Sequence, residues 1–201
     1  MTKQDLRITK TLKEIDRALL ESLGQSPIEK ITVDQICQRA MINRSTFYTY
    51  YRDKFDLLYR YLDRTLYEFR KRVDVAFINA TPQQVGDLIY QKNFEQVLQY
   101  MQENRQVYQL LWSLPLKRSV FAEMTQVVHD RILESISVRP DDSYAHFVDL
   151  YARLFASDMM TLVRWWFTCS DRISSEKLQQ IMSSNMKNGL FQTFFDCTKQ
   201  P

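Results

Sequence analysis

A run of polar and aromatic side chains at residues 43–54, NRSTFYTYYRDK, carries the groups in this chain best suited to bind a polar partner. If the run is helical, one face presents hydroxyl groups and a single cation: Arg44, Ser45, Tyr48 and Thr49. Phe47 and Tyr51 are four residues apart, so they share another face and can enter a core. Hydroxyl and guanidinium groups hydrogen-bond to phosphate oxygens and to base edges. This face therefore suits nucleic-acid recognition, with Thr46 and Tyr50 flanking it.

Helix start signals predict the elements that position these side chains. Thr32 and Gln35 form a capping box that opens a helix ending near residue 40. Asn43 is a suitable N-cap for the next short helix, and Asp53 with Asp56 opens a longer one. Two short helices joined by a turn, after a first long helix, predict a helix-turn-helix whose second helix enters the DNA major groove.

The remainder of the chain also has a helical composition. Only 3 Gly and 5 Pro occur in 201 residues, which favours an all-α fold of about nine helices with no strand. Later helices are expected over 106–112, 116–137, 144–169 and 175–197, and another behind a Thr81–Pro82 start signal. We expect an N-terminal three-helix domain at 1–66, a connecting helix at 53–78 and a helical domain at 79–201.

Charge separates the two expected domains. Residues 1–72 hold 15 Lys and Arg against 10 Asp and Glu, whereas residues 73–201 hold 12 against 14. A basic front end on a slightly acidic body is typical of a nucleic-acid reader joined to another module.

Other classes of protein lack support in the sequence. There is no secretory signal, the apolar stretch at 150–167 is interrupted by charges, and the three cysteines lack disulfide or metal spacing, so we expect a cytoplasmic protein without membrane contact. No glycine-rich phosphate loop, nucleophile elbow or paired-histidine motif is present. We therefore expect no enzymatic activity, no cofactor and no metal.

The stretch TVDQICQRAMINRSTFYTYYRDKFDLL at 32–58 resembles the DNA-binding signature of the TetR family of transcriptional regulators. The resemblance implies phosphate contacts from four positions: Thr32, Thr46, Tyr48 and Lys54. It implies base-facing positions for four others: Arg44, Ser45, Thr49 and Tyr50. Lys54 would lie in the first turn of a helix, where its charge opposes the helix dipole, and a phosphate partner would explain that placement.

Met41 departs from the family pattern, which usually has Gly in the turn. If the position requires a positive φ, the bulkier residue costs roughly 1 kcal/mol. This departure keeps open an alternative: an adaptor or sensor with the same fold that acts through a protein partner and binds DNA weakly.

The body is rich in aromatic residues and Met, which can line an apolar ligand pocket. The candidate pocket residues are Tyr108, Trp112, Phe121, Met124, Phe147, Tyr151, Phe155 and Asp158. Asp158 lies in an apolar stripe, so its carboxylate needs a partner: either an arginine of a second copy, such as Arg153 or Arg164 across a dimer, or a polar or cationic ligand group.

The resemblance also implies that the last two helices pair with those of a second copy. The candidate dimer-interface residues are Leu150, Leu154, Leu162, Trp165, Leu178, Met182, Gly189, Leu190 and Phe194. The stretch Arg164–Trp165–Trp166 before a Ser-capped last helix is similar to a subgroup that includes a regulator of dihydroxyacetone utilisation. The similarity is too short to indicate a ligand.

Taken together, the sequence predicts a homodimeric transcription regulator that binds a palindromic operator in double-stranded DNA and responds to an unidentified small molecule. Repression is the expected mode, and activation is an alternative.

Overall fold

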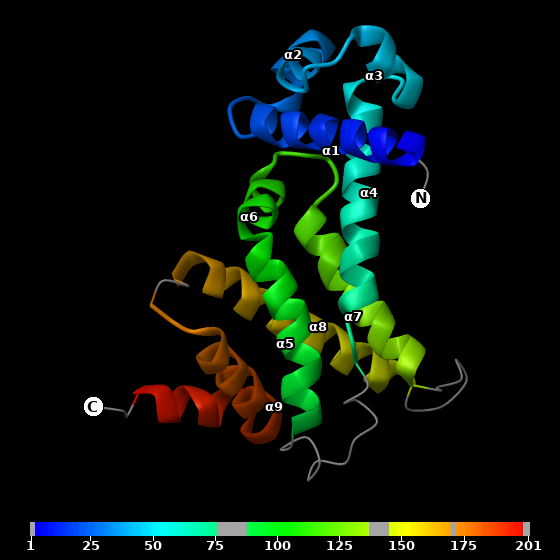
Figure 1. Ribbon diagram of the computed structural model, residues 1–201. Coiled ribbons are helices and arrows are strands. Elements are labelled where there is room, and N and C mark those ends of the chain that lie inside the picture. The colour runs from blue at the N-terminus through cyan, green and yellow to red at the C-terminus, as the bar shows by residue number, and fades with distance from the viewer. Residues whose placement is uncertain (1–2, 76–87, 137–144, 170–171, 199–201) are drawn as a thin grey trace. The chain divides into compact units, whose positions relative to one another are not determined.

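The computed structural model describes residues 3–75, 88–136, 145–169 and 172–198 (Figure 1). Within these ranges it contains nine α-helices, a single 3-10 turn and no β-strand, which confirms the predicted all-α class. The elements are α1 (Lys3–Leu23), the 3-10 turn η1 (Ile28–Lys30), α2 (Val33–Arg39), α3 (Arg44–Tyr50), α4 (Lys54–Arg72), α5 (Leu88–Glu103), α6 (Arg105–Ser113), α7 (Val120–Ser135), α8 (Ala145–Cys169) and α9 (Ser175–Thr198). None of the described helices is long and apolar enough to cross a bilayer.

The chain forms two compact units. One unit, called the head below, comprises Met1–Thr65 and Gln109–Arg118. The other, called the body, comprises Leu66–Tyr108 and Ser119–Pro201.

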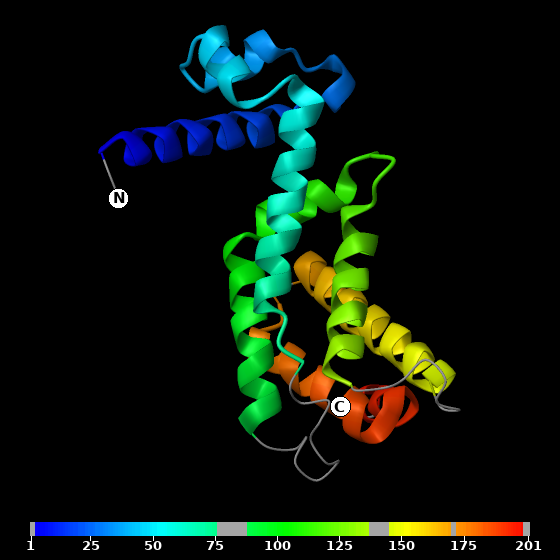
Figure 2. The same cartoon turned by 90° about the vertical axis from the view of Figure 1, so that its right-hand side faces the viewer.

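The head is built around a small apolar core between α1, α2 and α3. Helix α2 packs on α1 and α3 packs on α2, as Figures 1 and 2 show. Ile15 and Leu19 of α1 and Ile36 of α2 are fully buried, as expected for apolar residues at helical spacing. Arg64 of α4 also holds Asp16 of α1 by an ion pair of 2.6 Å, and burial raises the pKa of the Asp16 carboxyl.

The core of the body lies between α5, α7, α8 and α9. Helix α7 packs along α8, and α9 contacts both α5 and α8. Met160, Val163 and Phe167 of α8 are at most 2% exposed, since α8 is covered on one side by these neighbours. Trp166 is also buried, and its indole N–H donates to the Ile173 carbonyl at 2.8 Å, which ties α8 to the residues just before α9.

Two predicted helices differ from the structure in their extent, and the start signal of a third lies outside the described residues. Helix α7 begins at Val120 rather than residue 116, because the Ser119 hydroxyl caps it by accepting from the Ala122 N–H. The helix predicted over 175–197 is interrupted at Gly189, whose φ of 80° and ψ of 162° are not helical. The Thr81–Pro82 start signal lies outside the described residues, and α5 begins at Leu88.

Candidate nucleic-acid interface

The start of α2 is fixed by the predicted capping box. The Thr32 hydroxyl accepts from the Gln35 N–H at 3.2 Å, and the Gln35 amide oxygen accepts from the Thr32 N–H at 2.8 Å. Such a cap contributes about 1 kcal/mol to helix stability. It leaves the Thr32 side chain exposed.

The turn between α2 and α3 has the hydrogen bonding of a Schellman motif. The Ile42 N–H donates to the Cys37 carbonyl at 3.0 Å, and the Met41 N–H donates to the Gln38 carbonyl at 3.2 Å. This motif places its C′ residue in the left-handed region, where glycine is usual. Met41 occupies that position with a φ of 53°, so the positive φ that would make its side chain costly is present.

Helix α3 separates core residues from exposed residues as predicted. Phe47 is fully buried and Tyr51 is 4% exposed, whereas Tyr48 is 48% exposed. Ser45 and Thr49 are exposed as well, and the half-buried side chains of Thr46 and Tyr50 flank them. Asn43 precedes α3 as its N-cap residue, but its side chain makes no capping hydrogen bond.

Arg44 is held in place by two neighbours on the outward surface. Its Nε lies 3.2 Å from a carboxylate oxygen of Asp34 on α2. Its Nη2 donates to the Tyr48 hydroxyl at 3.5 Å, and the guanidinium carbon lies 5.9 Å from the centre of the Tyr48 ring. The hydrogen bond with Tyr48 and the Asp34 charge raise the pKa of Arg44. Asp34 was not among the predicted site residues, since a partner on the preceding helix cannot be inferred from local spacing.

Lys54 has a structural partner that the sequence did not indicate. Its ammonium group donates to the Glu29 carbonyl at 2.8 Å and to the Ile31 carbonyl at 2.7 Å. These bonds tie the start of α4 to η1 and compensate for the unfavourable position of the charge in the first helical turn. A phosphate is therefore not needed to explain the placement, although the ammonium has a third N–H.

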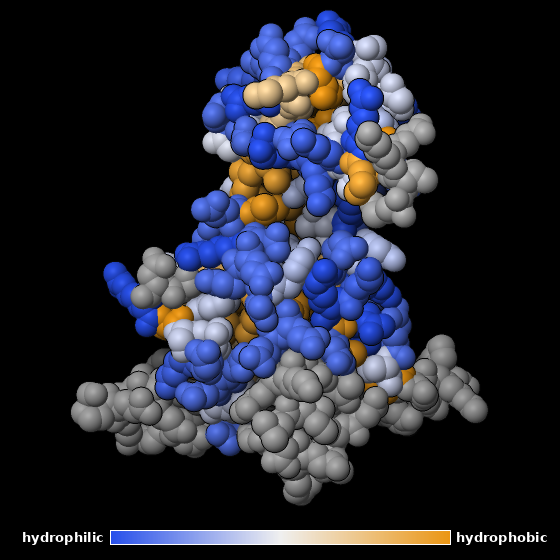
Figure 3. All heavy atoms as spheres, viewed as in Figure 1, coloured by the Kyte–Doolittle hydropathy of each residue, from blue (hydrophilic) through white to orange (hydrophobic). Residues whose placement is uncertain are grey.

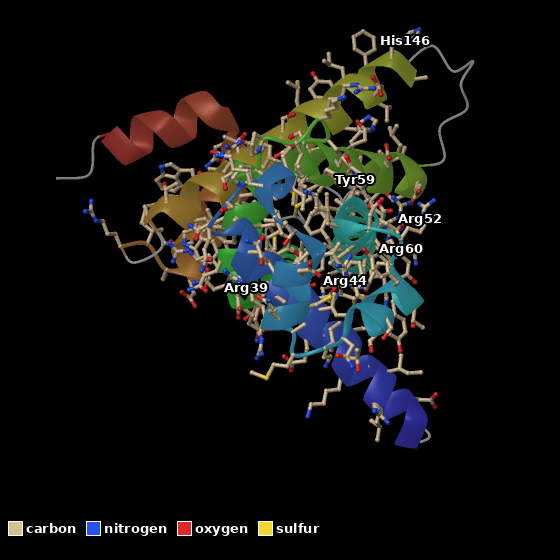
Figure 4. All side chains as sticks on the ribbon, turned by 90° about the horizontal axis from the view of Figure 1, so that it is seen from above. Arg39, Arg44, Arg52, Tyr59, Arg60 and His146 are labelled. Carbon is tan, nitrogen blue, oxygen red and sulfur yellow. The ribbon has the colours of Figure 1, made fainter. Side chains whose placement is uncertain are left out.

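Two further arginines meet at the start of α4. Arg52 and Arg60 both contact Asp56, at 3.4 Å and 3.0 Å, and Figure 4 shows these two arginines side by side, away from Arg39. The backbone N–H of Arg52 also donates to Asp56, which lowers the pKa of that carboxyl. Asp53 caps α4 as predicted, accepting from the N–H groups of Phe55 and Asp56 at 2.8 Å.

The predicted pocket residues differ in burial within the described part of the chain. Tyr108 and Met124 are core residues, while Phe147 and Tyr151 are 62% and 67% exposed. Trp112 belongs to the head. Phe121, Phe155 and Asp158 are half-buried.

A different set of residues surrounds a small apolar cavity of about 10 Å³ in the body, roughly the space of one water. Its lining residues come from the end of α4 and beyond it, from α5 and from α8: Phe69, Val73, Asp74, Val97, Leu98, Met101, Met159, Met160 and Val163. None of them was among the predicted pocket residues.

Asp158 finds an amide rather than an arginine within the chain. Asn185 of α9 donates to its carboxylate at 3.3 Å, and burial raises the pKa of the Asp158 carboxyl. Arg153 instead pairs with Asp149 at 2.8 Å, and Arg164 stacks over Phe121 at 4.7 Å from the ring centre.

The outward face of α8 is an exposed apolar stripe. Its members fall on one face of the helix and, apart from half-buried Leu162, are 43–67% exposed: Phe147, Leu150, Tyr151, Leu154, Leu162 and Trp165. Four of these six were predicted as dimer-interface residues, and the other two, Phe147 and Tyr151, were predicted to line a pocket.

The interface residues predicted on α9 differ in exposure. Leu178 and Met182 are at most 2% exposed, because they pack into the core of their own protomer. Gly189 is exposed at the break in α9. The side chains of Leu190 and Phe194 lie outside the described residues.

The head thus contains a helix-turn-helix within a three-helix unit, and the described part of the body is all-α. No family model matches the sequence, and no curated protein matches it. Among solved structures, the chain is similar to the dihydroxyacetone kinase operon activator DhaS, with a TM-score of 0.52 and 18% sequence identity. The match covers 92% of this chain and 97% of that chain, so the similarity of fold extends over both units.

Proposed function

We propose that the protein is a transcription regulator that binds double-stranded DNA as a homodimer and responds to a small molecule. The observation that carries this proposal is the exposed surface of α3. There Arg44, Tyr48 and Thr49 are exposed on a helix whose opposite side is buried in an apolar core. A rigid support of this kind keeps donors and acceptors in fixed positions relative to base edges. The fold shared with an operon activator supports the same assignment.

In the proposed complex, α3 lies in the major groove and Arg44 reads a guanine through its guanidinium. Its bonds to Asp34 and Tyr48 direct the guanidinium along the outward surface in the free protein. The ion pair is 61% and 54% exposed at its two ends, so water already weakens it and a base can replace Asp34. Thr32, Ser45, Thr46, Tyr48, Thr49 and Tyr50 supply the remaining contacts to bases and phosphates.

The apolar stripe on α8 is the proposed dimer interface. Exposed aromatic and aliphatic side chains in one row are typical of a surface that a protein partner covers. Two heads joined through their bodies would reach two successive major grooves, about 34–36 Å apart on B-DNA. The operator is then a two-fold symmetric sequence.

We propose that the effector binds in the body, where the one-water cavity between α5 and α8 must enlarge to admit it. Three of its lining side chains are Met101, Met159 and Met160, whose flexible thioether chains can rearrange around an apolar ligand. A ligand that binds one spacing of the two heads better than the other shifts the population between DNA-binding and non-binding dimers. Whether the regulator represses or activates depends on where its operator lies relative to the promoter.

The test is fluorescence anisotropy on duplex DNA from upstream of the protein's own gene and on unrelated duplexes, over a series of salt concentrations. Wild type should prefer a palindromic segment, and Arg44→Ala should reduce that preference by about tenfold or more. Tyr48→Ala should weaken binding to all duplexes alike. Arg17→Ala, which removes an equal charge from α1, is the control and should preserve the preference. Equal, salt-insensitive binding of all four proteins to every duplex, including those from a genome-wide selection, would contradict the proposal.

A further inference from the structure

A groove in the head runs between the first turns of α1 and the α2–α3 turn, beside the reading helix. It has a volume of about 880 Å³ and is lined by Arg7, Ile8, Thr11, Met41, Ile42, Asn43, Thr46 and Tyr50. Only Thr46 and Tyr50 belong to the predicted DNA contacts. The groove is thus continuous with the proposed DNA surface but extends it onto α1 and the turn.

Met41 is the unusual member of this lining. Its φ of 53° is strained for a side chain with a Cβ, and its side chain is 91% exposed. A methionine at this position gains almost no burial within the protomer to compensate for the strain. Strained backbone and an exposed apolar side chain at one residue together indicate a contact made outside the protomer.

The other lining residues indicate the chemistry of that contact. Arg7 is exposed and forms no ion pair within the described part of the chain, unlike Arg44, Arg52 and Arg60. The side chain of Asn43 has no capping role that would occupy its amide. The lining of the groove therefore combines a cation, an amide and hydroxyl groups with apolar side chains. In the view of Figure 3, hydrophobic residues are exposed among hydrophilic ones near the top, where α2 and α3 lie in Figure 1.

A DNA strand offers groups that match both kinds of side chain, because anionic phosphates are separated by apolar faces of deoxyribose. We propose that this groove seats one strand of the DNA beside α3, with Arg7 on a phosphate and Met41 packed against a deoxyribose. The inference rests on the proposed function and deepens it by naming a contact surface outside the reading helix.

Substitution of Met41 gives a test in which stability and binding should change in opposite directions. Met41→Gly relieves the positive φ, so we expect a rise in Tm of about 2–4 °C. The same variant loses the apolar contact, so its affinity for the duplex should fall by about tenfold. Met41→Leu keeps both the strain and the apolar bulk, and it should bind DNA like wild type. If Met41→Gly raises Tm and binds DNA as tightly as wild type or more tightly, Met41 makes no DNA contact and the inference is overturned.

Arg7→Ala tests the cation in the groove, and Lys13→Ala is its matched control. Both remove one positive charge from α1, but Lys13 lies on the opposite side of the helix from the groove. Only Arg7→Ala should reduce the salt dependence of binding, by about one unit in the slope of log K against log salt for each occupied groove. Equal slopes for the two variants would overturn the role of Arg7. A wild-type protein without salt-dependent DNA binding would overturn the proposed function, and the groove proposal with it.

Discussion

The outward surfaces of α3 and α8 are both exposed in the protomer, and they differ in chemistry. On α3 the outward groups are polar, and the main cation, Arg44, is already matched by Asp34 and Tyr48. On α8 the outward groups are apolar, and Tyr151 and Phe147 are more than half exposed. A polar surface is well solvated without a partner, whereas an apolar stripe is stabilised only when another apolar surface covers it.

This difference indicates two partners of opposite kinds. The α3 surface suits a ligand that exchanges with water and salt, as the phosphates and base edges of DNA do. The α8 surface suits a partner held by the hydrophobic effect, and a second copy of the chain presents the same stripe to it. The four experiments below test this contrast, from the largest expected effect to the smallest.

The largest effect should come from a charge placed in the α8 stripe. Leu154→Arg puts a guanidinium where the proposed dimer buries an apolar side chain, so the dimer dissociation constant should rise by about 100-fold or more. Sedimentation velocity over a concentration series measures this. His146→Arg adds a charge to an exposed residue of the same helix outside the stripe, labelled in Figure 4, and should leave the dimer intact. If Leu154→Arg is as dimeric as wild type, the α8 stripe is not the interface.

The next effect concerns the stability of the head. Lys54→Met leaves the Glu29 and Ile31 carbonyls without their charged donor, and the free energy of unfolding of the head should fall by about 1.5–3 kcal/mol. Urea denaturation followed by tyrosine fluorescence measures the loss. Lys30→Met, at an exposed position of η1, should change little. A Lys54→Met protein of wild-type stability with reduced DNA affinity would mean that Lys54 serves DNA and not the fold.

A smaller effect should follow from releasing Arg44. Asp34→Asn removes a carboxylate from the α3 surface and frees the guanidinium, so DNA affinity should rise by about threefold. Asp63→Asn on α4, where the carboxylate pairs with Arg118 instead, is the control and should have less effect. A loss of affinity in Asp34→Asn would show that Asp34 is needed to aim Arg44 rather than merely competing with DNA.

The smallest expected effect is a pH-dependent change in stability on substituting Asp158 in the body. Burial raises the pKa of Asp158, so its charged form is disfavoured in the folded state, and its contribution to stability falls as pH rises through that raised pKa. Asp158→Asn should therefore raise Tm at pH 7 by about 1–2 °C, and the gain should disappear as pH is lowered towards 4. Differential scanning fluorimetry across this pH range is sufficient.

Asp149 supplies the control of opposite sign. Hydrogen bonds from Arg153 and His129 lower its pKa, so its contribution is present at neutral pH and is lost on acidification. Asp149→Asn should lower Tm at pH 7. If Tm at pH 7 changes in the same direction in both variants, the opposite pKa shifts of Asp158 and Asp149 do not account for their effects on stability.

The parts of the head that local chemistry determines could be predicted from the sequence. The capping box of Thr32 and Gln35 involves residues three apart, and the separation of Phe47 from Tyr48 follows from helical periodicity. The strain at Met41 was also predictable, because a Schellman turn has a fixed backbone conformation.

Contacts between distant residues could not be predicted in this way. Asp34 and Arg44 are 10 residues apart, and Lys54 lies 23 and 25 residues from its two carbonyl partners. These contacts depend on how the helices of the head pack, so the predicted phosphate rationale for Lys54 overlooked a structural one.

In the body, burial was harder to predict from the sequence than in the head. Helix α8 is apolar on several sides, so residue type alone could not distinguish the buried side of Met160 from the exposed side of Tyr151. The resemblance assigned Leu178 to an interface, and its apolar type could not show that the protomer itself buries the side chain.

The most direct test of the central claim is selection of preferred sequences from a random pool of duplex DNA by the purified protein. It is followed by anisotropy on the selected duplex over a salt series. The account predicts an enriched two-fold symmetric sequence with half-sites one helical turn apart, bound by a dimer, with affinity that falls steeply as salt rises. No enriched sequence, together with binding that is weak and insensitive to salt, would contradict it and favour an adaptor that acts through a protein partner.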